Sequence, residues 1–259
     1  MRQYIWIALF ALCLGCSDDS PTATDPDLSA QHVVIEPVQF QTADGFRLFG
    51  TLFSAGDQTG SRPTIILLHP FNEDHTQWAG FVPELVTERG YLALAFDLRG
   101  HGTSIFKNGE PQTVQDFTVA DINQMPLDVE AAVTYLKTRP ESDTNRIGIV
   151  GTDIGANIAF ISAGTLPEVK ATVSVSPNFR NNQAEEVLIG TNIPGFEPQN
   201  ILYVAAFGDG YAYTSSQTMS GLTQGTTSVI GYQGLGHGLD LLADDAAWAA
   251  VLDWLDQNL

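Results

Sequence analysis

The sequence predicts a single α/β domain in which a mainly parallel β-sheet is covered by helices on both faces. Short apolar runs rich in branched residues are typical of strands buried on both faces, and helical patterns separate most of them. A β-rich pair at the start of the domain predicts an antiparallel edge. With 259 residues, of which 44% are hydrophobic and 16% charged, the chain can bury one sizeable core.

The first half of the domain begins with a hairpin, in which HVVIEPVQFQT and FRLFGTLFSAG are joined across Asp44 and Gly45. TIILLHP at 64–70 and YLALAFD at 91–97 follow as buried strands. Between these two strands we expect a helix over 78–89, which Gly90 ends.

The second half begins after a polar loop over 98–115, where the spacing of apolar residues predicts a long helix over 119–138. RIGIVG is expected to be a strand, and IGANIAFISAG the helix that follows it. Three further strands are predicted in ATVSVS, ILYVAAFG and TTSVIGY. The C-terminal helix presents one apolar face, which consists of Trp248, Leu252, Leu255 and Leu259.

The amino terminus has the pattern of an export signal. Arg2 precedes an apolar run that is too short to span a bilayer, and the run ends at Gly15 and Cys16. The segment LCLGCSDDS resembles the lipobox of bacterial lipoproteins, although Cys13 stands where an aliphatic residue is usual. The resemblance implies lipidation of Cys16 and a protein in the bacterial cell envelope, held on the membrane by its lipid alone and facing the periplasm or the exterior. An ordinary secretory signal is the alternative.

These features divide the chain into a signal peptide over 1–15, a flexible acidic tether over 16–30 and a folded domain over 31–259. Both cysteines lie before the folded domain, so we expect no disulfide within it. The whole chain has 30 acidic and 11 basic residues and a formal net charge of −19. Because such a surface repels phosphate backbones, nucleic acid is not an expected partner.

The segment VGTDIGAN over 150–157 has the spacing of a nucleophile elbow, G-x-S-x-G, with Asp153 at the central position. Four other polar segments lie at or just beyond the ends of expected strands: LLHPFNEDHTQW, AFDLRGHGTS, AAFGDGYAY and GLGHGLDLL. Together the five segments resemble the α/β-hydrolase superfamily, and the resemblance covers about 33–259. Apart from the residue at the elbow, these motifs are similar to those of dienelactone hydrolases and serine esterases without a cap domain.

The resemblance implies that Asp153, Asp209 and His237 form a catalytic triad in that chain order. It also implies an oxyanion hole made by the backbone N–H groups of Phe71 and Ile154. Pro70 follows the histidine of the first segment, where the superfamily usually has glycine. Asp240 is a rival for the acid, but its place at an expected helix start favours a capping role.

The other histidines are expected to be structural or solvent-exposed. His69 and His101 follow strands, and the resemblance makes them residues that shape loops. His75 has acidic neighbours in Glu73 and Asp74, but adjacent loop residues rarely converge on one ion, so no metal site is expected. No cofactor is expected either.

An aspartate at the elbow changes the chemistry. A carboxylate that attacked an ester carbonyl would form a mixed anhydride, so serine-esterase chemistry does not transfer to Asp153. A carboxylate can instead displace a leaving group from saturated carbon and form an ester that water hydrolyses. In this respect the chain resembles haloalkane dehalogenases and epoxide hydrolases. It departs from them in having Ile154 after the nucleophile, where an aromatic residue is common. Those enzymes also insert a helical cap after the sixth strand, whereas here only 23 residues without a helical pattern, Asn178 to Asn200, separate the two strands.

We therefore favour a hydrolase that acts on a small organic substrate. Candidates for the substrate pocket and for contacts to a leaving group are Asn72, Trp78, Tyr211 and Tyr213. Two alternatives remain open. Asp153 can act as a base that activates water directly, or the protein is a catalytically inactive homologue that binds a ligand or serves a structural role in the envelope.

Overall fold

The computed structural model describes residues 32–56, 59–179 and 194–259. The predicted signal peptide, the tether and the lipidation site Cys16 lie outside the described residues. No helix in the described ranges is long and apolar enough to cross a bilayer.

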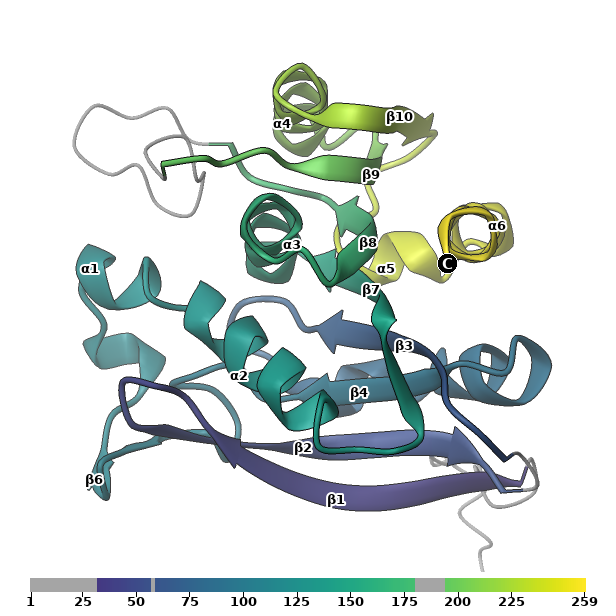
Figure 1. Ribbon diagram of the computed structural model, residues 1–259. Helices are drawn as coiled ribbons and strands as arrows, with labels where there is room; N and C mark the ends of the chain where they lie inside the picture. Colours follow the sequence, from purple (N-terminus) through teal and green to yellow (C-terminus); the bar gives the residue numbers. More distant parts are fainter. Residues whose placement is uncertain (1–31, 57–58, 180–193) are drawn as a thin grey trace, which may run out of the picture.

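One sheet forms the centre of the molecule (Figure 1). The strands β10-β9-β8-β7-β3-β4 run parallel, and β2 continues the sheet antiparallel to β4. The parallel strands are β3 (Arg62–Leu68), β4 (Leu92–Phe96), β7 (Ser142–Thr152), β8 (Val169–Val175), β9 (Gln199–Ala206) and β10 (Gln224–Tyr232). The predicted α/β class and mainly parallel sheet are confirmed.

The antiparallel edge is also confirmed. β1 (Val33–Gln41) and β2 (Phe46–Ala55) pair across the predicted hairpin. The small strands β5 (Phe106–Lys107) and β6 (Glu110–Pro111) extend this edge from the loop after β4.

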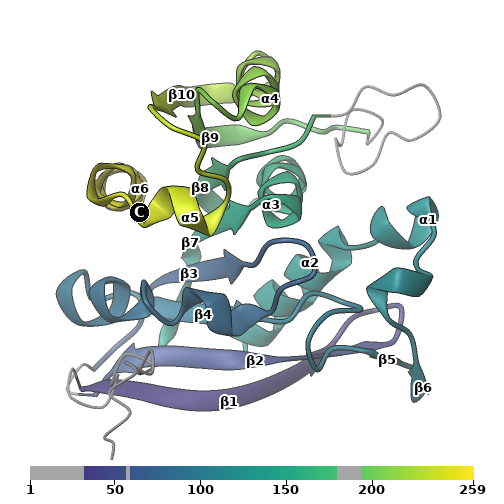
Figure 2. The same cartoon turned by 180° about the vertical axis from the view of Figure 1, so that it is seen from behind.

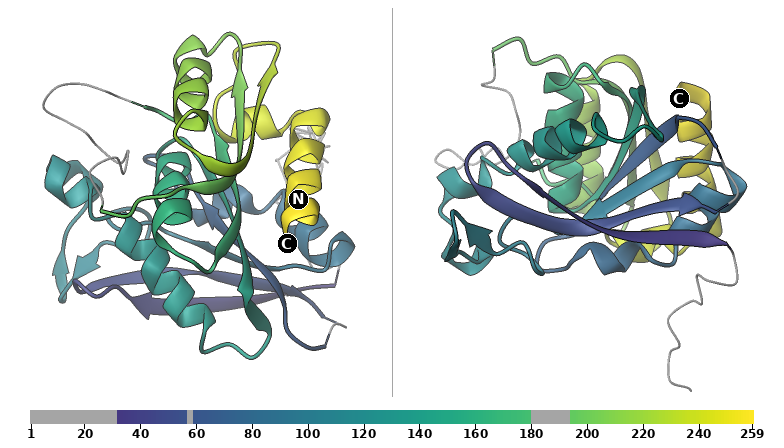
Figure 3. Two further views of the ribbon diagram at one scale, coloured as in Figure 1. Left: turned by 45° about the horizontal axis from the view of Figure 1, so that its top comes forward. Right: turned by 60° about the horizontal axis from the view of Figure 1, so that its bottom comes forward.

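Helices cover both faces of the sheet (Figures 2 and 3). One face carries α2 (Pro126–Leu136) and α3 (Ile154–Thr165), and α4 (Gly210–Ser220) also packs there through Met219. The other face carries α5 (Leu239–Leu242) and α6 (Asp245–Asn258). The side chains of β3 alternate between the two cores, with Ile65 in one and Ile66 in the other, as a strand buried on both faces requires.

One expected helix is interrupted, and another is shorter than expected. The segment expected as one helix over 119–138 forms α1 (Val119–Ile122) and α2, because Pro126 has no backbone N–H and stands at the first position of α2. Within the segment expected as a helix over 78–89, residues 82–88 are helical and include a π-helical turn (Glu84–Glu88), while a 3₁₀ turn (His75–Trp78) comes before them. Pro83 lies in the first turn of this helical run, where a proline is tolerated because its N–H would have no helical partner.

The connection between β8 and β9 is the place where related folds insert a cap. Its described residues, 176–179 and 194–198, contain no helix, and 180–193 lie outside the described ranges. Phe196 in this connection packs edge-on against Phe160 of α3, with the ring centroids 5.2 Å apart.

Candidate active site

The turn between β7 and α3 places Asp153 at the carboxyl end of the sheet. Asp153 has φ 53° and ψ −114°, a strained conformation that a carboxylate residue tolerates better than a branched one. Glycine is required on both sides, because a Cβ on Gly151 would lie 2.1 Å from the Gly155 carbonyl oxygen. A Cβ on Gly155 would lie 2.6 Å from the carbonyl oxygen of Leu68. The local sequence thus turns a strand into a helix and presents the Asp153 side chain at the turn.

The carboxylate of Asp153 lies between a backbone donor and an imidazole. Its Oδ2 accepts a hydrogen bond from the Phe71 N–H at 3.0 Å. Its Oδ1 lies 3.7 Å from Nε2 of His237, which is an ion-pair distance and slightly too long for a hydrogen bond. Catalytic contacts of this kind are often long before substrate binds. Pro70 therefore does not turn the predicted donor of Phe71 away from the elbow.

Asp209 holds the other side of the imidazole. It lies just beyond β9 and caps α4, where Oδ1 accepts a hydrogen bond from the Ala212 N–H at 3.2 Å. Its Oδ2 contacts Nδ1 of His237. Asp209, rather than the rival Asp240, is therefore the carboxylate next to His237, while Asp240 lies in the first turn of α5. The structure brings Asp153, Asp209 and His237 together in the order Asp153, His237, Asp209.

These contacts set the charges of the site. For Asp153, burial opposes ionisation, but the contact with His237 and the N–H groups of Phe71 and Ile154 outweigh it and lower the pKa. For His237, the Asp153 carboxylate is the largest cause of a raised pKa, burial opposes it, and Asp209 adds to it, giving about 9. At neutral pH, the free site therefore holds an imidazolium between two carboxylates.

Ser176 supports the histidine loop, and sequence reasoning did not single it out. It follows β8, is fully buried and has φ 51°. Its Oγ accepts a hydrogen bond from the N–H of Gly238 at 2.9 Å, directly after His237. The only signal in the sequence was its place at the end of the predicted strand ATVSVS, where site residues of parallel sheets collect.

Asp97 supports the loop that carries Phe71. Its Oδ1 accepts hydrogen bonds from the backbone N–H of His75 at 3.0 Å and from Nδ1 of His75 at 2.5 Å. Its Oδ2 accepts hydrogen bonds from Thr103, so one buried carboxylate joins the loops after β3 and β4. Burial opposes ionisation of Asp97, but these hydrogen bonds lower its pKa to about 2.

Oxygen and nitrogen atoms of Asp74, His75 and Asp97 lie within 4.8 Å of one another. The sequence argument against a metal did not foresee that Asp97 joins this group from a different strand. The atoms are engaged in hydrogen bonds: Asp74 accepts from Thr76, and Nε2 of His75 lies 3.3 Å from Oγ1 of Thr51. These interactions account for the cluster as a loop anchor.

His69 and His101 also hold loops. Nδ1 of His69 lies 2.7 Å from the Pro70 carbonyl oxygen, and its Nε2 accepts a hydrogen bond from the Leu98 N–H. Burial lowers the pKa of His69 to about 4, so the ring is neutral. His101 is buried between the rings of His69 and Phe71. These placements agree with the roles that the resemblance implied.

The four candidate pocket residues have different environments. Trp78 is fully buried in the core against Phe81, so it cannot line a pocket rim. The hydroxyl of Tyr211 donates to the Phe179 carbonyl at 3.0 Å, although half of the side chain is exposed. Tyr213 packs against Phe207. Asn72, next to Phe71, has φ 63°, and its Oδ1 lies 3.5 Å from the amide nitrogen of Gln115.

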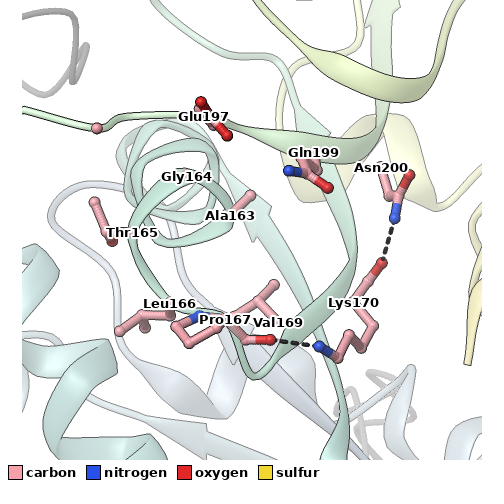
Figure 4. A pocket seen from close by; sticks show the side chains of 11 residues that line it. Ala163, Gly164, Thr165, Leu166, Pro167, Val169, Lys170, Glu197, Gln199 and Asn200 are labelled. Atoms are coloured by element: carbon pink, nitrogen blue, oxygen red, sulfur yellow. Dashed lines mark hydrogen bonds between the residues drawn. The ribbon is translucent and has the colours of Figure 1, made fainter.

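The described surface also has hollows away from the triad. One of about 390 Å³ lies at the carboxyl end of α3, where Lys170 donates to the Pro167 carbonyl and Asn200 donates to the Lys170 carbonyl (Figure 4). A smaller hollow of about 260 Å³ lies beside the Phe71 loop, between Asn72 and Gln115. Of the two, only the smaller one adjoins the loop that contacts Asp153.

Comparison with known proteins relates the chain to hydrolases. The sequence profile of the dienelactone hydrolase family matches residues 54–195, more than half of the chain. A thiohydrolase from Arthrinium phaeospermum is 34% identical over 144 residues, which are 55% of this chain and 43% of that protein. A polyketide transferase from Penicillium crustosum is 28% identical over 143 residues, 55% of this chain and 44% of that protein. The match thus spans less than half the length of these two relatives.

Solved structures share the fold. An esterase from Pyrococcus furiosus superimposes with a TM-score of 0.68 and 21% identity, covering 92% of this chain and 96% of the esterase. A dienelactone hydrolase from Anabaena variabilis superimposes with a TM-score of 0.65 and 17% identity, covering 88% of this chain and 99% of the hydrolase. At these identities the likeness concerns the fold, and it confirms the predicted α/β-hydrolase architecture.

Proposed function

The chain belongs to the dienelactone hydrolase family, and from this premise we propose that it is a hydrolase of small organic substrates with Asp153 as its nucleophile. One observation carries the proposal. The Asp153 carboxylate directs Oδ2 to the Phe71 N–H and Oδ1 toward His237. One oxygen is therefore held by an oxyanion-type donor, while the other is placed beside the group that would activate water.

The first step is displacement at saturated carbon. Oδ1 of Asp153 attacks the carbon, the bond to the leaving group breaks, and the leaving group departs with the electron pair. The lowered pKa of Asp153 keeps the nucleophile ionised at neutral pH. The product is an ester between Asp153 and the substrate carbon.

Formation of the ester changes the state of His237. Esterification removes the negative charge of Asp153, which is the largest cause of the raised pKa of His237. The imidazolium then loses its proton more readily, to the leaving group or to solvent, and the neutral ring can act as a base. Asp209 continues to hold the ring through Nδ1. The Asp153 carboxylate thus keeps His237 protonated before alkylation, and loss of its charge on esterification frees a neutral ring that can accept a proton from water.

The second step is hydrolysis. Water attacks the ester carbon of Asp153 while His237 takes its proton. The developing oxyanion at Oδ2 is stabilised by the N–H groups of Phe71 and Ile154. Collapse of this intermediate breaks the bond between the carboxyl carbon and Oδ1, and the departing alkoxide takes the proton from His237 to leave as an alcohol that contains Oδ1. The oxygen from water remains in the carboxyl group of Asp153, which then loses its proton.

A second candidate is a catalytically inactive ligand-binding protein. It is favoured by the same hydrogen bond, because the Asp153 carboxylate itself accepts from the Phe71 N–H that would stabilise an oxyanion. Asp153 also forms an ion pair with His237. Direct activation of water by Asp153 is less well supported, because a carboxylate with a lowered pKa is a weak proton acceptor. The names of the curated relatives suggest acyl transfer, yet acyl transfer to Asp153 would require a mixed anhydride.

Trapping the ester tests the proposal. His237→Gln should stall the reaction after alkylation, so incubation with haloalkanes, haloacids and epoxides should add substrate mass to the peptide that contains Asp153. Asp153→Asn should give no adduct, and His32→Gln, a change at an exposed histidine, should turn over like the unmodified protein. In a parallel assay, Asp153→Ser should gain activity toward activated esters if the oxyanion donors are competent. Absence of both adduct and esterase activity would contradict the proposed chemistry.

A further inference from the structure

Several exposed apolar side chains belong to residues that hydrogen-bond to a triad residue or lie within two positions of one. The described residues include eight large hydrophobic side chains that are exposed, and four of them lie next to triad residues or their loops. We call these four the apolar rim: Phe71, Phe207, Tyr211 and Leu235. Leu235 is 81% exposed, the highest value of the eight. Single exposed apolar residues are common, but a group around one site indicates binding.

One hydrogen bond and short sequence separations relate the rim to the triad. Phe71 donates its N–H to Asp153, and Tyr211 lies in the first turn of α4, two residues after Asp209. Leu235 precedes His237 by two residues. Its strand-end segment pairs with the Asp209 loop through the hydrogen bond from Gly208 N–H to the Gly234 carbonyl at 2.9 Å.

Leu235 closely approaches this loop. A Cβ on Gly208 would lie 2.5 Å from Cδ2 of Leu235, so the absence of a side chain at Gly208 lets Leu235 pack against the loop. Phe207, the preceding residue, packs its ring against Tyr213 at a centroid distance of 4.9 Å. Leu235 and Phe207 of the rim are therefore held by contacts with the segments that carry Asp209 and His237.

The charges of the site disfavour an anion. Two acidic side chains, Asp153 and Asp209, contact the one basic side chain of the triad, His237. Two carboxylates and one imidazolium leave a local charge of about −1. The whole chain carries a formal charge of −19, which adds a long-range repulsion of anions. A carboxylate ligand would thus lose its hydration at an apolar, negatively charged site.

We propose that the rim binds the hydrocarbon part of neutral substrates and that the site discriminates against carboxylate-bearing ones. This inference names the substrate class of the proposed hydrolase and rests on the proposed function for the reaction, although the binding itself requires no chemistry. Under the proposed function, neutral haloalkanes and epoxides are then better substrates than haloacids of the same length.

Unreactive probes test the binding separately from the chemistry. Dissociation constants of 1-butanol, 1-hexanol, 1-octanol and octanoate can be measured with the unmodified protein by NMR titration. We expect binding of the alcohols to tighten about two- to fourfold per added methylene, as expected for burial of apolar surface. Octanoate should bind at least about tenfold more weakly than 1-octanol at low ionic strength. Equal binding of octanoate, or no dependence on chain length, would overturn the proposal.

A matched pair of variants locates the site. Leu235→Ser should weaken binding of 1-octanol by about three- to tenfold. Leu222→Ser, a change at the opposite end of α4 where the leucine is 37% exposed, should leave it unchanged. Equal effects of both variants would overturn the assignment to the rim. Leu235-dependent binding of neutral phosphatidylcholine vesicles without binding of 1-octanol would also overturn it, in favour of a lipid surface.

The outcomes distinguish this inference from the proposed function. Rim-dependent binding of 1-octanol without any adduct on Asp153 would support the rim and refute the nucleophile. An adduct on Asp153 formed equally well from haloacids would support the nucleophile and refute the rim.

Discussion

His237 lies between two carboxylates, and its titration reports both contacts. We predict that the imidazole titrates with a pKa of about 9 in the unmodified protein, against an ordinary value of 6.5. Asp153→Asn removes the largest cause of this shift, so the pKa should fall toward the ordinary value. NMR titration of the ring measures both values. An unchanged pKa in the variant would show that Asp153 does not act on His237.

The same contacts make stability depend on pH. Because the folded state raises the pKa of His237, its contribution to stability is fully present below pH 6.5 and is lost as the pH rises through about 9. Half of the side chain is exposed, so solvent screening limits the effect to about 1 kcal/mol or less. Between pH 6 and pH 9.5, the free energy of unfolding in urea should fall less in His237→Gln than in the unmodified protein. The same loss in both proteins would contradict this assignment.

Ser176 is expected to position His237 through Gly238. Ser176→Gly removes the acceptor of the Gly238 N–H but tolerates φ 51°, so stability should change little. The loosened loop should lower the pKa of His237 and slow hydrolysis of the Asp153 ester by about tenfold. NMR titration and adduct decay provide the two measurements. A slowed reaction with unchanged titration would argue against the positioning role.

Individual site residues were predictable where a chemical pattern identifies them. Asp153, Asp209 and His237 follow a fixed chain order at strand ends, so their convergence could be expected from the sequence. Ser176 could not, because its role depends on the long-range approach of Gly238. Trp78 was a candidate for the substrate pocket, whereas its large apolar ring is buried in the core.

At the scale of elements, the turn from β7 into α3 depends on two glycines. We predict that Gly151→Ala destabilises the fold by about 3 kcal/mol or more, because the added Cβ would lie 2.1 Å from a backbone oxygen. Gly80→Ala is the control, since no atom lies within 4 Å of its added Cβ, and it should change stability by less than about 0.5 kcal/mol. Urea unfolding compares the two. Equal stability of both variants would contradict the steric account of the elbow.

The elements themselves were largely predictable from periodicity and composition. The strands were found because buried parallel strands are continuous apolar runs, as in β3 and β4. Helix continuity was predicted less well, because Pro126 starts a new helix within a segment whose apolar spacing still resembles one helix. The α4 helix was not foreseen, since its sequence GYAYTSSQTMS has little helical patterning, and Asp209 caps it at the amino end.

The whole molecule is strongly acidic. With 30 acidic and 11 basic residues, repulsion between like charges should destabilise the folded state at low ionic strength. We predict that raising NaCl from about 0.01 to 0.15 M increases the melting temperature, because the Debye length falls from about 30 to 8 Å. Differential scanning calorimetry measures the change. A lower melting temperature in salt would mean that attractive ion pairs, such as Arg99 with Asp128, dominate.

The leader sequence predicts the location of the whole protein. We propose that Cys16 is lipidated and that the mature chain begins there. Protein expressed with its leader should then partition into detergent and show acyl mass on Cys16. Cys16→Ala should abolish both, whereas Cys13→Ala should not. A product cut elsewhere, or one that does not partition into detergent, would refute the proposal.

The fate of the oxygen atom of water tests the central claim most directly. Single-turnover reactions in H₂¹⁸O, with protein in excess over a neutral haloalkane or epoxide, should place ¹⁸O in the Asp153 peptide and none in the first product, because Oδ1 leaves with the alcohol. Label in the product with an unlabelled Asp153 would contradict the nucleophile and assign Asp153 as a base. No turnover and no label with any member of the panel would favour the ligand-binding alternative.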